Sequence, residues 1–126
     1  MTKSIALKAY EDFGAGDLDK RVIIRRREDR AIGYSSITQS YSDVRKRWAS
    51  LKPVGTSVWA SSLQTEETVT HRAVIRFMEG IGIDHELVYA GVVYRVKRST
   101  PLDGGRVFLI IELEELGSEE AVYGTS

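Results

Sequence analysis

The sequence contains no cysteine, only two prolines and two histidines, and no long apolar run. The lack of cysteine excludes disulfides, thiolate zinc sites and thiol catalysis. No stretch reaches the roughly 20 apolar residues that a membrane-spanning helix needs, and no basic start followed by an apolar run marks a signal peptide. We therefore expect a soluble intracellular protein with no membrane partner.

A strong charge of either sign is also missing. Lys plus Arg and Asp plus Glu both number 18, so the composition gives no argument for nucleic acid or an anionic membrane as a partner. The charge is uneven along the chain, because residues 1–63 hold 12 basic and 7 acidic side chains and residues 64–126 hold 6 and 11. These halves of +5 and −5 suit either head-to-tail contacts between copies or an unevenly charged solvated surface.

A length of 126 residues predicts one domain, which we divide into an N-terminal arm (1–17), a β-barrel (18–116) and a flexible tail (117–126). The stretch SIALKAYEDFG in the arm fits a short helix, with Ser4 as its N-cap and Gly14 as its terminator. A flexible arm without regular structure is the alternative.

Alternating apolar and polar residues predict about six strands, at residues 20–27, 41–53, 68–77, 87–89, 92–99 and 106–116. The dipeptide Ala90–Gly91 turns one hairpin. Short turns and the lack of a normal-length helix outside the N-terminus favour a mostly-β fold, a small antiparallel β-barrel or sandwich. A long loop separates strands 2 and 3, and a short N-terminal helix or arm precedes the sheet.

Three strands contain side chains that the alternation alone does not explain. In residues 41–53, Val44 and Trp48 share one parity and Ala49 and Leu51 share the other, so we expect a bulge near Trp48 that turns all four inward. Residues 22–24 and 108–111 are apolar on both faces. Their outer faces pack either under the N-terminal segment or on a neighbouring subunit.

Residues that carry catalysis are scarce. His71 alternates with core positions and is expected to be structural, and His85 lies in a turn with Asp84 and Glu86, where consecutive residues seldom supply three converging metal ligands. No P-loop, nucleotide-binding glycine pattern or serine elbow is present. We expect no catalytic residue, no metal and no cofactor.

Basic residues gather at Arg25, Arg26 and Arg27 and again at Arg45 and Arg47. Arginines at a strand end contact phosphates readily. No aromatic residue lies within that strand, residues 20–27, although stacking aromatics are typical of single-strand binders. The cluster is therefore a poor sequence reader, and it suits the lining of a channel for passing duplex DNA or a surface for an acidic partner.

Taken in order, five motifs resemble the bacteriophage head–tail joining family, also called head-closure or head–tail adaptor proteins, over about residues 18–116. The motifs are LDKRVIIRR, YSDVRKRWASLKP, HRAVIRF, LVYAGVVYRV and a final apolar strand ending in LEEL. The resemblance implies a β-barrel without enzymatic activity. Such proteins form rings in the virion neck of a tailed phage or prophage, between the portal with its adaptor and the tail, and are assembled in the host bacterial cytoplasm.

The resemblance also implies that the ring retains packaged duplex DNA and offers the tail a docking surface. The family's long loop, which helps to plug the channel in some members, corresponds here to residues 54–69. The candidate loop residues are Val54, Gly55, Val58, Trp59, Ser61, Gln64, Glu66 and Glu67. The candidate subunit or DNA contacts are Arg25, Arg26, Arg27, Arg45, Arg47, Phe108 and Ile110.

Trp59 is the unusual residue of this loop. A loop of about 15 residues without regular structure is uncommon inside a compact domain, so its length indicates a function. Trp59 either folds back to cap one end of the barrel or, with Val58, anchors the loop on an adjacent subunit or ring. The alternative function for the whole chain is a nucleic-acid-binding barrel of the oligonucleotide-binding type.

Overall fold

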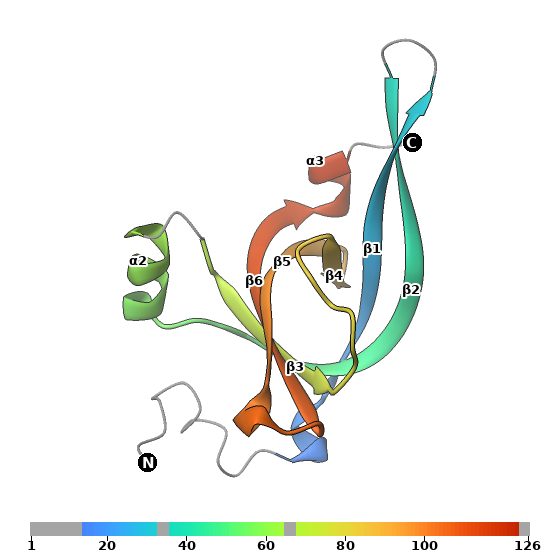
Figure 1. The fold of residues 1–126 in the computed structure, drawn as a ribbon. Helices are drawn as coiled ribbons and strands as arrows, with labels where there is room; N and C mark the ends of the chain where they lie inside the picture. Colours follow the sequence, from blue (N-terminus) through green and yellow to red (C-terminus); the bar gives the residue numbers. More distant parts are fainter. Residues whose placement is uncertain (1–13, 33–35, 65–67, 124–126) are drawn as a thin grey trace.

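The computed structural model of the chain describes residues 14–32, 36–64 and 68–123 and shows a closed six-stranded barrel (Figure 1). The order around the barrel is β1-β2-β3-β6-β5-β4, and every neighbouring pair is antiparallel. The strands are β1 (Lys20–Ile32), β2 (Ser36–Pro53), β3 (His71–Arg76), β4 (His85–Tyr89), β5 (Val92–Pro101) and β6 (Phe108–Ser118). The expected mostly-β antiparallel barrel is confirmed.

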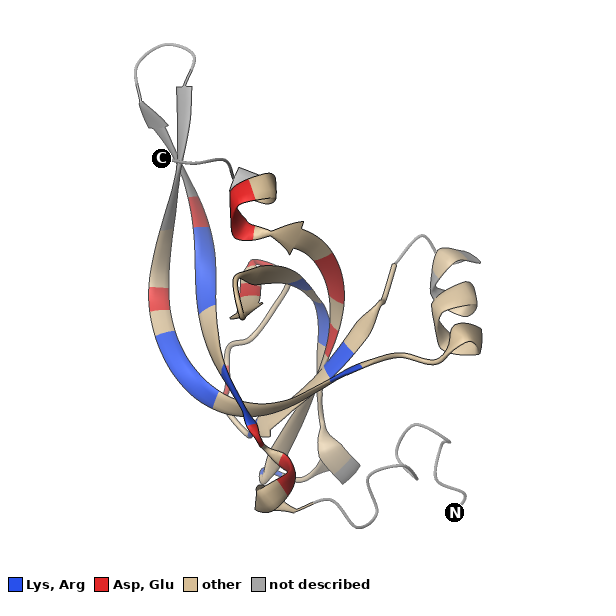
Figure 2. Ribbon diagram, turned by 180° about the vertical axis from the view of Figure 1, so that it is seen from behind, with Lys and Arg blue, Asp and Glu red and all other residues tan. Residues whose placement is uncertain are grey.

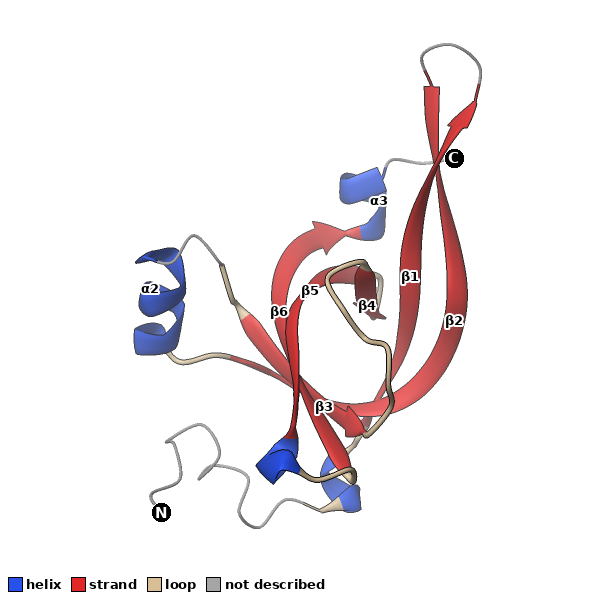
Figure 3. Cartoon of the chain, in the orientation of Figure 1, coloured by secondary structure: helices blue, strands red, loops and turns tan. Residues whose placement is uncertain are grey.

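Helices occupy little of the described chain (Figure 3). They are η1 (Ala15–Asp17), α2 (Thr56–Gln64), η2 (Leu102–Gly104) and α3 (Glu119–Tyr123), where η marks a 3-10 helix. The short helix expected at residues 4–14 lies outside the described residues, except for Gly14. Helix α3 forms within the expected C-terminal tail, whose mobility stays a prediction.

The barrel interior is filled by side chains that alternate along each strand. The innermost positions of β3 and β6 are Ala73, Ile75, Ile111 and Leu113, all of which are fully buried in one apolar cluster with Val22 and Ile24 from β1 and Leu87 from β4. This is the alternation expected for β3 and for β6, except that Val107 precedes β6 and is exposed. The interior is therefore a packed core.

Part of the outer surface is covered as well. Leu18, which follows η1, forms a second apolar cluster with Val74 on β3 and Ile110 on β6. Here the segment before β1 shields the outer face of β6, as one of the two sequence alternatives had it. Helix α3 contacts β5 and β6 at another place on the outside.

The prediction for β2 is wrong at Trp48. Pairing with β1 runs without a break from Lys20↔Ala49 to Ile24↔Arg45, so no bulge lies near Trp48. Ala49 is buried, and the unbroken alternation turns Trp48 to the outside, where 52% of its surface is exposed. The bulge lies farther along the strand, where one residue of β1 faces Asp43 and Val44, and Asp43 has a φ of 52°.

The long segment between β2 and β3 is not the irregular loop expected from its sequence. Nine of its residues form the short helix α2, which the sequence analysis did not predict. The serines and threonines of TSVWASSLQ suggested a loop, whereas Trp59 and Leu63 stand four residues apart, on one face of a helix. Figure 1 shows α2 standing away from the barrel wall.

The β4–β5 hairpin turns at Ala90 and Gly91, as expected. Tyr89 pairs with Val92, and both turn residues have positive φ, 51° for Ala90 and 79° for Gly91. Two such residues fit the twist of a two-residue hairpin, in which Asn-Gly is the preferred pair. In this left-handed conformation the Cβ atom of Ala90 lies unfavourably close to the following carbonyl oxygen, so Ala90 is strained there.

We predict that Ala90→Asn stabilises the barrel by about 0.5–1 kcal/mol, because Asn tolerates the left-handed conformation better than Ala. Urea unfolding followed by circular dichroism measures the change. Ala60→Asn in helix α2 is the matched control and is expected to bring no gain, because Ala is the better helix former. A loss of stability with Ala90→Asn would contradict the turn geometry.

Candidate partner-binding surfaces

Helix α2 exposes an uncharged apolar ridge. Trp59 is 43% exposed and Leu63 is 45% exposed, while Val58 is half-buried. None of these residues belongs to either apolar cluster of the barrel. Trp59 is therefore not part of the buried core, and its two interpretations, as a cap of the barrel end and as a partner contact, stay predictions.

The two ends of the α2 segment are fixed to the sheet. The Val54 amide donates to the Thr70 carbonyl at 2.9 Å, and the Thr70 amide donates to the Leu113 carbonyl of β6 at 2.8 Å. Gly55, beside Val54, is exposed, and its carbonyl accepts from the Trp59 amide at 3.0 Å in the first turn of the helix. The segment therefore presents the helix from a defined position.

The remaining candidate residues of this segment are less informative. Ser61 is exposed on the helix, and Gln64 is its last residue. Glu66 and Glu67 lie outside the described residues. No charged side chain lies between Thr56 and Gln64, so α2 offers neither sign of charge to a partner.

A second exposed apolar surface, which the sequence analysis missed, lies on the outer face of β1 and β2. The register pairs Arg21 with Trp48 and Ile23 with Lys46, and Val44 lies on the same side because it has the strand parity of Lys46 and Trp48. Trp48 is 52% exposed and Val44 is 59% exposed, and the Arg21 guanidinium lies 5.3 Å from the Trp48 ring centroid. We call these five residues the β1–β2 patch. The unbroken alternation from Ala49 and Leu51 is the signal that locates it.

Arg25 points into the molecule rather than toward a partner. It is 8% exposed, its Nε lies 3.3 Å from a Glu86 carboxylate oxygen, and its second guanidinium arm reaches Glu119 of α3 at 2.8 Å. The ring of Tyr41 stacks on the guanidinium at 3.7 Å, and burial raises the pKa of the Tyr41 phenol. Glu86 is 2% exposed, so this ion pair is part of the packed structure.

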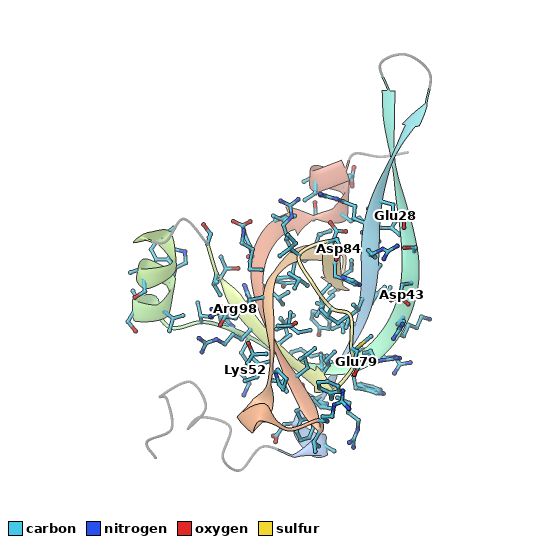
Figure 4. The ribbon with its side chains drawn as sticks, in the orientation of Figure 1. Glu28, Asp43, Lys52, Glu79, Asp84 and Arg98 are labelled. Carbon is cyan, nitrogen blue, oxygen red and sulfur yellow. The ribbon has the colours of Figure 1, made fainter. Side chains whose placement is uncertain are left out.

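Other cations of the basic cluster are also engaged within the chain. Arg26 donates to Glu28 at 2.9 Å, and this hydrogen bond raises the pKa of Arg26. Arg45 donates to Asp43 at 2.7 Å, and Arg47 donates to the carbonyl of Lys46. Figure 2 shows acidic positions among the basic ones along β1 and β2, and Figure 4 labels Glu28 and Asp43 there. This pairing weakens the case for a phosphate-binding surface.

The negative half of the sequence is likewise neutralised in part by the fold. Arg98 and Lys97 of β5 pair with Glu112 and Glu114 of β6, at 2.8 and 3.9 Å. The charge asymmetry along the chain therefore does not become a separate acidic face on β6. Phe108 is half-buried beside the cluster that contains Ile110, with the Arg76 guanidinium 5.9 Å from its ring centroid.

Both histidines have structural surroundings. His71 packs edge-to-face on Tyr94 with ring centroids 5.0 Å apart, and burial raises the pKa of the Tyr94 phenol. His85 is buried, with Nδ1 at 2.8 Å from an Asp84 oxygen. Within the described ranges, no three His, Asp or Glu side chains are grouped to hold a metal ion.

One open cleft of about 320 Å³ lies beside the start of β4 and is lined by Arg27, Ile83, Arg95, Val96 and Lys97. The lining consists of three cationic and two aliphatic side chains, and it includes no carboxylate, imidazole or hydroxyl group that could act in catalysis. Among the described residues, no helix is long and apolar enough to cross a membrane.

Comparison with known proteins gives one family and one fold. Residues 13–116 match the model of the phage head completion protein family. No curated protein matches the chain. The solution structure of protein SF1141 from Shigella flexneri 2a has a similar fold, with a TM-score of 0.63 and 23% identity over 82% of this chain and 97% of that chain.

We predict that Glu86→Gln costs about 1–3 kcal/mol of folding stability, because it removes the more deeply buried of the two carboxylates that pair with the Arg25 guanidinium. Urea unfolding measures the loss. The matched control is Glu79→Gln, which removes an ion pair with Arg106 between two exposed side chains and is expected to cost less than about 1 kcal/mol. Equal effects of the two changes would contradict a structural role for the buried pair.

Proposed function

This chain belongs to the phage head completion protein family, which supports a structural role in closing the phage head. We propose that it is a connector of the virion neck. In this proposal it assembles as a ring between the portal with its adaptor and the tail. The ring retains the packaged DNA and gives the tail a surface on which to dock. Family membership makes the chain a virion component that contacts other virion proteins.

Helix α2 is the observation that carries this proposal. The barrel has a complete core without it, yet the chain spends nine residues on a helix that exposes Trp59 and Leu63. Tryptophan is among the residues that contribute most to protein interfaces. We therefore assign α2 the role of contacting a protein partner within the neck.

The chemistry of α2 also fits a channel through which duplex DNA passes. A surface rich in Lys and Arg would bind phosphates and hold the DNA in place. Helix α2 carries no charge, and its exposed polar residues include Ser57 and Ser61. A helix of this composition can lie near DNA without binding its phosphates and slowing its passage.

Catalysis is not part of the proposal, because His85 contacts Asp84 and His71 packs on Tyr94. The nucleic-acid-binding alternative gains no specific observation. Arg25 is buried against Glu86 and Glu119, and Arg26 and Arg45 pair with carboxylates of the same chain.

We predict that deleting residues 56–66 leaves the barrel folded but prevents head closure. Val54 and Thr70 already meet through a backbone hydrogen bond, so the shortened connection of Gly55, Glu67, Thr68 and Val69 has the length of an ordinary hairpin loop. Circular dichroism of the purified protein tests the fold. Electron microscopy and plaque counts of phage carrying the deletion test closure, with DNA-emptied heads and free tails expected.

A finer comparison uses single changes on the same helix. We predict that Trp59→Ala weakens the partner contact about 30-fold or more, whereas Ser61→Ala changes it little. Infectious titre measures both. Normal titres with Trp59→Ala and with the deletion would show that α2 has no role in the neck.

A further inference from the structure

Most of the large apolar side chains exposed on the described part of the chain fall into two sets. Trp59 and Leu63 form the ridge of α2, and Val44 and Trp48 belong to the β1–β2 patch. Single exposed apolar residues are ordinary, but contiguous sets mark interaction sites. Each set contains a tryptophan that lies outside both apolar clusters of the barrel.

The two surfaces lie on different sides of the molecule. In Figure 1, α2 is on the left and the β1–β2 ribbon is on the right with the barrel between them, and Figure 2 shows the same separation from behind. The hydrogen bond between Val54 and Thr70 fixes the base of α2. Helix α2 is therefore held away from the β1–β2 patch of its own chain.

We propose that α2 of one copy packs on the β1–β2 patch of the next copy. This inference rests on the proposed connector function and names the two surfaces through which copies meet. Two different surfaces on opposite sides give a heterologous contact, which repeats from copy to copy and closes into a ring when the rotation permits.

The dimensions of the two surfaces agree. Nine helical residues span about 14 Å at 1.5 Å per residue. From Val44 to Trp48, strand β2 extends about 13 Å at 3.3 Å per residue. The helix is thus long enough to cover the patch from one end to the other.

The chemistry of the two surfaces is complementary as well. The patch places Trp48, Val44 and the half-buried Ile23 together, with Arg21 and Lys46 beside them. Trp and Arg are enriched at protein interfaces. Helix α2 has no charged side chain between Thr56 and Gln64, so it can cover the apolar residues of the patch without burying a charge of its own.

Cross-linking tests the contact directly, because the chain has no cysteine and an introduced thiol is unique. Val44→Cys, Leu63→Cys and the double variant are incorporated into phage particles and treated with a short bismaleimide. The double variant is expected to give a ladder of oligomers. Each single variant is expected to stay monomeric, and particles containing both single variants are expected to give dimers only.

Two controls define the outcome. Ile83→Cys lies outside both surfaces on a highly exposed side chain; it is expected to react with a monofunctional maleimide but not to cross-link to Leu63→Cys. Trp48→Ala in the double-cysteine chain is expected to reduce the ladder about 10-fold or more. A midpoint of thermal unfolding close to that of the unmodified protein shows that the fold of each purified variant is intact.

Dimers from either single variant would overturn the proposal, because they require like surfaces to meet. A double variant that stays monomeric in closed, tailed particles would overturn it as well, while leaving the connector function in place. Failure of that function is seen separately, as normal head closure after deletion of α2.

Discussion

The barrel depends on a short seam between β1 and β4. Only four residue pairs join these strands, from Ile23↔Val88 to Arg26↔His85, whereas β1 and β2 pair along almost their whole length. The ion pair between Arg25 and Glu86 lies within this seam, and Glu119 of α3 adds a second carboxylate from outside. This short seam thus contains a buried ion pair between its two strands. Helix α3 contributes to it although it lies beyond the range matched by the family model.

The apolar core and the β1–β4 seam contain no residue of α2. Two exposed apolar surfaces are therefore free to contact partners. The interior cluster uses the inward positions of all six strands, and Leu18 and α3 cover parts of the outside. Apart from the single side chains of Ile83 and Val107, the large apolar residues that remain exposed on the described part of the chain belong to the ridge of α2 and the β1–β2 patch. A protein that acts by assembly needs surfaces of this kind, since its binding energy comes from apolar area that is buried only when partners meet.

The strand pattern could be predicted because it depends on local alternation. Ile75, Ile111 and Leu113 lie inward as expected, and the hairpin turns at Ala90 and Gly91. Trp48 was placed wrongly because its size suggested burial, whereas the strand register decides which face it takes. Helix α2 was missed because serine and threonine are typical of loops. The Arg25–Glu86 pair joins residues 61 positions apart, and no local pattern reveals such a partner. The functional surfaces were therefore harder to predict than the core.

The base of α2 also determines how the barrel bears mechanical load. Both ends of the segment leave at one edge of the β2–β3 pair, where Val54 bonds to Thr70 and Thr70 bonds to Leu113 of β6. A pull on the helix is thus shared by three adjacent strands. Thr70 holds β6 a second time, since its hydroxyl accepts from the Glu115 amide at 2.7 Å. A force applied to α2 would therefore be distributed over β2, β3 and β6 before any one of these strands separated from the sheet.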